Sequence, residues 1–185
     1  MINCYKDYKT DLINAINSLD EKTLNSIIRS VIDTNKKNKT VYLIGNGGSS
    51  ATPSHSAGDW SKELNIKAFC LSDNTPALTA FANDTDYSNI FKGQLKVFLE
   101  PGDLVLAYSG SGNSSNVINA IKYAKSKGNY TIGFTGNYNN LNGGSLSELA
   151  DLCLVVNTIS MEIIEDLHLI INHIIKESIK LHSKT

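Results

Sequence analysis

The sequence predicts an α/β fold with a doubly wound, five-stranded parallel sheet flanked by helices and bordered by long N- and C-terminal helices. Two observations support this fold class. Five short apolar runs, each typical of a buried strand, alternate with helical patterns along the chain. Longer helical patterns stand outside this alternation at both ends. The chain has 185 residues, no internal repeat and no linker, so we expect a single domain over residues 1–185.

The elements follow from local patterns of apolar residues. An N-terminal helical segment is predicted over about residues 5–37, with a break near Leu19–Glu21, and the α/β core over about 40–156. The strands of this core are expected at Val41–Ile44, Ala68–Leu71, Leu104–Ala107, Thr131–Phe134 and Leu152–Val155. Its helices are expected at about Ser50–Leu64, Asn89–Leu99, Asn113–Ser126 and Ser145–Leu149. A C-terminal helix is expected over about 161–182.

This C-terminal helix is apolar around much of its circumference. The apolar positions are Ile163, Ile164, Leu167, Leu169, Ile170, Ile171, Ile174, Ile175 and Ile179. A helix that is apolar beyond one stripe must be covered on more than one side. The pattern therefore predicts self-association, and a central core helix of a monomer is the alternative.

Composition and charge limit the partners and the compartment. The formal net charge of −1 gives no electrostatic reason to expect nucleic acid or an anionic membrane as a partner. Cys4, Cys70 and Cys153 are scattered, which argues against a disulfide framework or a cysteine zinc site. The polar start, Met1–Lys9, lacks the apolar core of a signal peptide, and no apolar run is long enough to span a membrane. We expect a cytoplasmic protein.

Two loops rich in glycine and serine follow the first and third predicted strands. They are Gly45–Ser50 and Ser109–Ser115, and each leads into a helix. Ligands of open parallel sheets bind at the carboxyl ends of strands. Glycine lets backbone N–H groups approach a ligand closely, and a helix N-terminus carries partial positive charge. Together the loops predict a phosphate site that needs no arginine.

Other interpretations of these loops stay open. Neither loop is a Walker sequence, and neither completes the pattern GxGxxG. Asp73 lies roughly where a ribose-binding acid would stand, so spacing alone leaves a dinucleotide site possible. Each loop could also be a tight turn with a serine cap. The density of serine favours a phosphomonoester.

Histidines and carboxylates gather on two predicted helices. His55 and Asp59 are four residues apart and face the same way on a helix. On the last helix Glu162, Asp166 and His173 share a stripe, with Glu165 beside it. Two imidazoles and two carboxylates suit zinc or a similar divalent ion, or proton transfer next to a carbonyl. Salt bridges on a solvated helix face are the alternative.

These motifs resemble those of SIS-domain sugar-phosphate isomerases, and the phosphoheptose isomerases in particular. The resemblance rests on Gly45–Ser49 followed by His55, on Ser109–Ser114, and on Glu165–His168 leading to His173. It covers about residues 10–182. It implies an α/β sandwich, a homotetramer with active sites between subunits, and a role in heptose biosynthesis for lipopolysaccharide or capsule. The implied reaction converts sedoheptulose 7-phosphate to glycero-manno-heptose 7-phosphate through an enediol.

The resemblance also implies roles for individual residues. Asp59 and His173 would take and return the proton. Zinc, where the family binds it, would be held by His55, Asp59, Glu165 and His173. The residues implied in phosphate or substrate binding are Asn46, Gly47, Gly48, Ser49, Asp84, Ser109, Gly110, Ser111, Ser114, Glu162 and Glu165.

The chain departs from the family pattern at several of these positions. The family has glutamate at Asp59, and usually has glutamine at Glu165 and aspartate at Glu162. The segment Trp60–Lys67 is shorter than its counterpart and lacks an arginine that the family carries. The charge of Glu165 favours retention of a metal. A non-catalytic phosphosugar-binding or protein-interaction module, or an isomerase of another sugar phosphate, is the alternative function.

Overall fold

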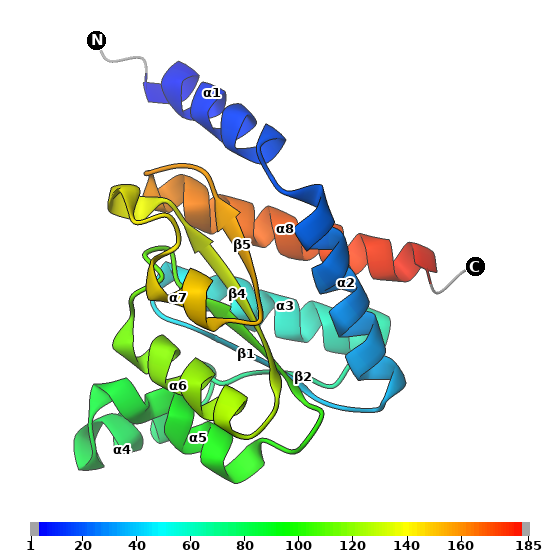
Figure 1. The fold of residues 1–185 in the computed structure, drawn as a ribbon, viewed down its shortest axis with the longest axis vertical. Coiled ribbons are helices and arrows are strands. Elements are labelled where there is room, and N and C mark those ends of the chain that lie inside the picture. Colours follow the sequence, from blue (N-terminus) through cyan, green and yellow to red (C-terminus); the bar gives the residue numbers. More distant parts are fainter. Residues whose placement is uncertain (1–3, 183–185) are drawn as a thin grey trace.

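The computed structural model describes residues 4–182, and five strands form one parallel sheet at its centre (Figure 1). The strand order is β2-β1-β3-β4-β5, and every neighbouring pair is parallel. The strands are β1 (Val41–Gly45), β2 (Ala68–Cys70), β3 (Leu104–Tyr108), β4 (Tyr130–Gly136) and β5 (Leu152–Val156). The predicted fold class is confirmed. The ends of the predicted domain, residues 1–3 and 183–185, lie outside the described residues.

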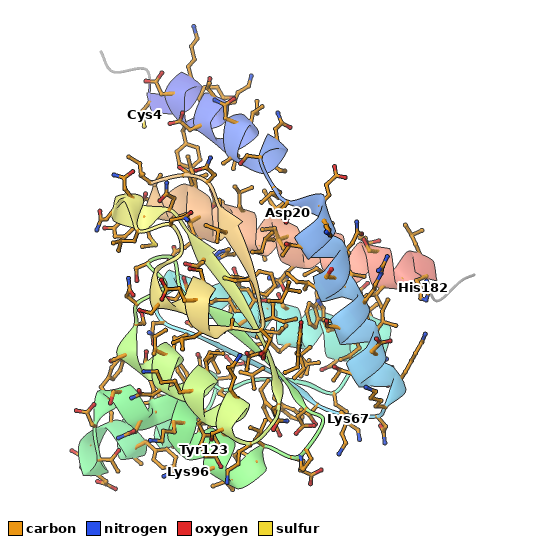
Figure 2. All side chains as sticks on the ribbon, in the orientation of Figure 1. Cys4, Asp20, Lys67, Lys96, Tyr123 and His182 are labelled. Carbon is orange, nitrogen blue, oxygen red and sulfur yellow. The ribbon has the colours of Figure 1, made fainter. Side chains whose placement is uncertain are left out.

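Helices cover both faces of the sheet. One face packs against α2 (Glu21–Lys36), α3 (Gly48–Leu64) and α8 (Met161–His182), and α1 (Cys4–Asn17) packs against α8. The other face packs against α4 (Thr75–Asp84), α5 (Ile90–Phe98), α6 (Ser115–Ser126) and α7 (Gly144–Leu149). Two short 3₁₀ turns, η1 (Tyr87–Asn89) and η2 (Tyr138–Asn140), complete the described elements. Side chains fill the space between these layers (Figure 2).

The apolar runs of the strands serve both layers because successive side chains point to opposite faces. Leu43 and Leu106 are register partners and belong to the core beneath α3 and α8. Their neighbours Ile44 and Ala107 belong to the core beneath α5 and α6. A strand buried on both faces needs a continuous apolar run, which is the pattern found in the sequence.

The breadth of apolar surface on α8 is explained by packing within the chain. This helix contacts α1, α2, α3 and β4. Its buried apolar residues are Ile163, Ile164, Leu167, Ile171, Ile175 and Ile179. A helix covered on several sides by its own chain matches the alternative of a core helix. Self-association stays a prediction.

The break predicted in the N-terminal helical segment is confirmed. The first helix ends at Asn17, and Asp20, labelled in Figure 2, caps the second by accepting a hydrogen bond from the backbone N–H of Lys22. Within residues 4–182, no helix has the length and apolar character needed to cross a membrane.

Helix α4 was not predicted from the sequence. None of its ten residues is fully buried, but Leu78, Phe81 and Ala82, at spacings of three and four, are partly buried against the core beneath α5 and α6. Two start signals were also available: the Asn74 side chain accepts from the backbone N–H of Ala77, and Pro76 stands in the first turn. The apolar pattern of α4 spans little more than one turn, so these start signals are needed to recognise the helix.

Candidate active site

The two glycine-serine loops meet at the carboxyl edge of the sheet because β1 and β3 are neighbouring strands. Between the loops lies a cleft of about 250 Å³. It is lined by Asn46, Gly47, Gly48, Ser49, Tyr108, Ser109, Gly110, Ser111, Ser114, Met161 and Glu165. Nine of the eleven residues that the resemblance assigned to phosphate or substrate binding are in this lining. The helices α3 and α6 both begin at the loops, so their N-termini lie at this edge.

A pair of side-chain amides ties the two loops together. Asn46 Nδ2 donates to Asn116 Oδ1 at 2.9 Å, and Asn116 Nδ2 donates to Asn46 Oδ1 at 2.8 Å. Tyr87 adds a third contact, its hydroxyl donating to Asn46 Oδ1 at 3.2 Å. Asn116 is buried on the first turn of α6, where its Oδ1 also accepts from the backbone N–H of Val117. The pair fixes one loop relative to the other.

The second loop needs glycine at one position. Gly112 has a φ of +66°, a conformation that residues with a Cβ rarely adopt. A Cβ there would lie 1.7 Å from the carbonyl oxygen of Gly143. The hydroxyls of Ser109 and Ser114 are 3.3 Å apart on this loop, and the Ser111 hydroxyl accepts from the backbone N–H of Asn113. The loop thus gathers three hydroxyls on a tightly turned backbone.

Glu165 lies at the N-terminus of α3. A Cβ placed on Gly48 would come within 2.1 Å of its Oε2 atom, so only glycine admits the carboxylate there. Burial raises the pKa of Glu165, and Glu162 raises it further, while hydrogen bonding from Ser49 acts in the opposite direction. A carboxylate therefore already lies where the helix N-terminus would favour an anion.

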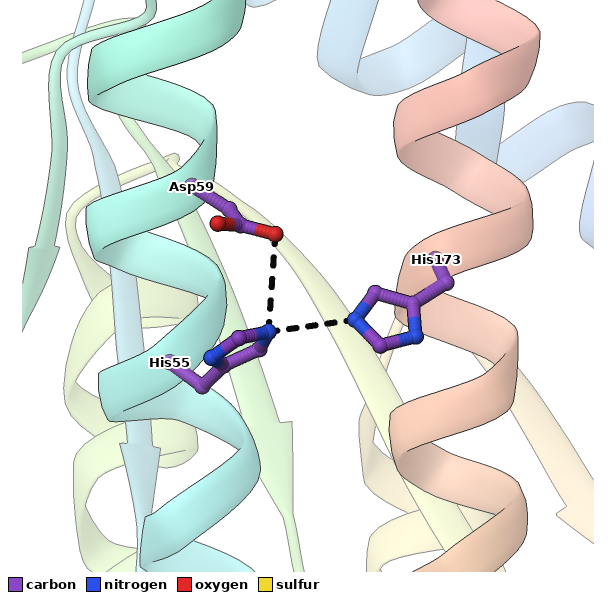
Figure 3. Close-up of side chains that lie close together, drawn as sticks. All are labelled: His55, Asp59 and His173. Atoms are coloured by element: carbon purple, nitrogen blue, oxygen red, sulfur yellow. Dashed lines mark hydrogen bonds and ion pairs between the residues drawn. The ribbon is translucent and has the colours of Figure 1, made fainter.

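His55, Asp59 and His173 lie together between α3 and α8 (Figure 3). His55 Nε2 is 3.1 Å from His173 Nε2 and 3.4 Å from Asp59 Oδ2. The two rings meet edge to face, with centroids 5.3 Å apart. Both histidines are exposed, and Asp59 is half-buried. The spacing of four residues on α3 and the packing of α3 against α8 produce this cluster.

The three donors fit a divalent metal. One ligand atom from each residue falls within 4.8 Å of the others. Bonds of about 2.0 Å in tetrahedral geometry separate ligand atoms by roughly 3.3 Å, close to the distances around His55 Nε2. Two imidazoles and one carboxylate leave a fourth position open, as catalytic zinc sites do.

Two basic residues of α8 pair with the acidic residues of α3 beside this cluster. Lys176 Nζ is 2.7 Å from Asp59 Oδ2 and 3.3 Å from Glu63 Oε1. Lys180 Nζ is 2.7 Å from Glu63 Oε2. The hydrogen bond from Lys176, followed by its positive charge, holds the pKa of Asp59 below its ordinary value. Asp59 is therefore ionised at neutral pH.

Comparison with known proteins identifies the family. The family model described as "SIS domain" matches residues 4–136. The chain belongs to the SIS-domain family. It is 35% identical over 160 residues to a phosphoheptose isomerase of Aliarcobacter butzleri, covering 84% of this chain and 82% of that one. It is 39% identical over 153 residues to a probable phosphoheptose isomerase of Thermoplasma acidophilum, covering 80% of each.

A solved structure agrees with these relatives. A phosphoheptose isomerase from Neisseria gonorrhoeae superposes with a TM-score of 0.88 at 26% identity, covering 95% of this chain and 94% of that one. This SIS domain is therefore an isomerase of the phosphoheptose isomerase type. The family resemblance found in the sequence is confirmed.

The structure does not bring three of the predicted site residues to every group that the resemblance assigned them. Glu165 lines the cleft, as its substrate-binding assignment expects, but it does not join the one metal-compatible group found within residues 4–182. It precedes His173 by eight residues, about 12 Å along α8, and its carboxylate lies against Gly48 of the first loop instead. Glu162 is exposed and accepts from the Ser160 hydroxyl, and Asp84 is exposed and accepts from Asn83. In the described chain neither Glu162 nor Asp84 lines the cleft between the loops.

Sequence reasoning missed two residues of this SIS domain's site. Asn116 follows the second loop and carried no separate signal, because its partner Asn46 is 70 residues away. Lys176 stands three residues after His173, on the same side of α8, and that spacing was the available signal. Its partner on α3 could not be read from the sequence because the register of the two helices is set by tertiary packing.

Proposed function

We propose that this protein is an aldose–ketose isomerase that converts sedoheptulose 7-phosphate to glycero-manno-heptose 7-phosphate. The observation that carries the proposal is the placement of two features on the same pair of helices. The phosphate-type cleft lies at the first turns of α3 and α8, and the His55–Asp59–His173 cluster lies further along both. Similarity to proteins named phosphoheptose isomerase supports this substrate.

The cleft supplies the groups that a phosphate monoester requires. The hydroxyls of Ser109, Ser111 and Ser114 would donate to phosphate oxygens, as would loop amides around Gly47 and the amide of Asn46. The partial positive charges of two helix N-termini would offset the charge of the phosphate. Ser49 and Gly110 complete the wall.

The cluster supplies a base and a proton carrier. The ionised Asp59 carboxylate would accept the proton from the hydroxyl-bearing carbon next to the ketose carbonyl, and a proton delivered to the carbonyl oxygen would complete the enediol. Return of a proton to the former carbonyl carbon, with loss of the hydroxyl proton on the neighbouring carbon, would give the aldose, and the imidazole of His173 would carry the protons that move between the oxygens. His55, in contact with both, would hold them in position.

We propose that His55, Asp59 and His173 bind zinc or a similar divalent ion. When bound, such an ion would polarise the carbonyl oxygen and offset the negative charge that develops on it. The Glu165 side chain is assigned to substrate binding, because its carboxylate faces the cleft and not the imidazoles. To act as a fourth metal ligand, the Glu165 carboxylate would have to move away from Gly48.

We further propose a homotetramer with active sites between subunits. Asp84 and Glu162 are predicted to contact sugar hydroxyls, yet both are exposed away from the cleft of their own chain. An active site completed by a partner subunit would use them there. Sedimentation of the purified protein tests the assembly.

Assay of purified protein against a panel of five- to seven-carbon ketose and aldose phosphates tests the reaction. We expect the highest kcat/KM with sedoheptulose 7-phosphate. His173→Ala should lose turnover and keep the circular dichroism of the wild type, and His182→Ala, on the same helix, should stay active. Full activity of His173→Ala would remove His173 from the mechanism. Sugar phosphate binding without turnover in the wild type would favour a non-catalytic binding module.

A further inference from the structure

A row of paired charges continues the His55–Asp59–His173 cluster along the interface of α3 and α8. Lys176 is held between Asp59 and Glu63, at 2.7 Å and 3.3 Å, and its side chain is only 12% exposed. Lys180 binds Glu63 from the far side. The lysine next to the cluster is therefore an ordered part of the site and not a mobile surface side chain.

One carboxylate oxygen serves two neighbours. Asp59 Oδ2 lies 2.7 Å from the Lys176 ammonium and 3.4 Å from His55 Nε2. It is the carboxylate oxygen that faces the imidazoles (Figure 3). A metal bound by both histidines would also coordinate Asp59 Oδ2, which already accepts a hydrogen bond from the Lys176 ammonium.

We propose that Lys176 is a resident cation that sets the metal affinity of the site by competing for Asp59 Oδ2. The inference rests on the metal site of the proposed function. A divalent ion binding there meets a positive charge a few ångströms away, a distance at which water screens the repulsion only in part. The ion must displace the ammonium from Asp59 before it gains the carboxylate.

The neighbouring glutamate makes that displacement possible. Glu63 already contacts Lys176 at 3.3 Å, so the ammonium can keep one partner when Asp59 turns to a metal. Metal binding would therefore leave Lys176 paired with Glu63 alone. The site is expected to bind metal reversibly and more weakly than its two imidazoles and carboxylate would by themselves.

Zinc affinity measured by competition with a chromophoric chelator tests this proposal without any activity assay. All proteins carry Cys4→Ser, so that zinc binding by an exposed thiol does not contribute to the measured affinity. We expect Lys176→Met to lower the Kd for Zn²⁺ at least about tenfold. Lys180→Met removes the same charge one turn further along α8 and should change the Kd by less than about threefold. Lys176→Gln, which keeps a polar end, should behave as Lys176→Met does and serves if the methionine variant does not fold.

Each outcome is decisive. Equal zinc affinity in the wild type, Lys176→Met and Lys176→Gln overturns the competition and leaves the metal site intact. An equal decrease of the Kd for Zn²⁺ in Lys180→Met also overturns the competition, because the loss of a long-range positive charge would then explain the effect. No zinc binding in any of the proteins overturns the inference together with the metal part of the proposed function. Loss of binding in His173→Ala locates the zinc at the cluster.

Discussion

His168 should make the stability of the fold depend on pH. The ring is fully buried on α8, edge to face with Tyr108 and Phe134, at centroid distances of 5.8 and 6.2 Å. Its Nε2 lies 3.4 Å from the carbonyl oxygen of Thr135. Within the described residues its Nδ1 has no hydrogen-bond partner. Burial without a counter-charge lowers the pKa of His168 from 6.5 to about 4.

The sign and size of the effect follow from this lowered pKa. Between pH 6.5 and pH 4 the unfolded chain binds a proton at His168 that the folded chain does not bind. The free energy of unfolding therefore falls as the pH falls through this range, and the contribution is complete above pH 6.5. A depression of about 2.5 pH units corresponds to a loss of about 3 kcal/mol on going from pH 7 to pH 4.

Urea unfolding at a series of pH values, at constant protein concentration, measures this loss. The raised pKa of Glu165 changes the free energy of unfolding with pH in the opposite direction. The effect of His168 is therefore measured as a difference between variants and not from the wild-type pH dependence alone. His168→Gln has no titrating group and should lose about 3 kcal/mol less than the wild type. His182→Gln changes an exposed histidine of the same helix and should parallel the wild type. Parallel curves for the wild type and His168→Gln would refute the reasoning.

Three further predictions concern the cleft. Asn116→Ala breaks the amide pair between the loops and should lower the free energy of unfolding by about 2–3 kcal/mol. The control Asn119→Ala loses a single hydrogen bond and should lower it by under about 1 kcal/mol. Urea unfolding measures both. Gly112→Ala forces a Cβ against a carbonyl oxygen at positive φ and should cost at least about 3 kcal/mol, whereas Gly58→Ala, with open space around it, should be neutral or stabilising. Glu165→Gln removes a negative charge from the cleft, so calorimetry should show inorganic phosphate binding about three- to tenfold more tightly. An unchanged phosphate affinity would place that carboxylate outside the phosphate site.

Much of the architecture could be predicted because local patterns determine it. The strand at Val41–Gly45 is a continuous apolar run, and the sheet buries it on both faces. The predicted bounds of the C-terminal helix, 161–182, match the observed ones because apolar periodicity persists over its full length. The break before Asp20 was visible as an interruption of the apolar periodicity in the N-terminal helical segment. Helix α4 was missed because its apolar pattern, Leu78, Phe81 and Ala82, spans little more than one turn.

The separate motifs of the site could be predicted from the sequence, but how they come together in the fold could not. Serine and glycine after strand ends predicted a phosphate cleft, and the spacing of His55 and Asp59 predicted one face of a helix. The meeting of the two loops depends on β1 lying beside β3, which the order of elements in the sequence does not determine. The pairing of Lys176 with Asp59 depends on the register between α3 and α8, which packing in the core sets.

Two helices set the distance between the cleft at the loops and the His55–Asp59–His173 cluster. Gly48 and His55 are seven residues apart on α3, about 10 Å of helix rise, and Glu165 and His173 are eight apart on α8. Each helix therefore carries residues of both the cleft and the cluster, and the core packing between the helices holds the two groups in register. In the proposed reaction the phosphate is held at one end, so the number of helical turns would select the length of sugar whose carbonyl reaches the cluster. Loop contacts would then determine affinity, and helix geometry would determine which carbon gives up its proton.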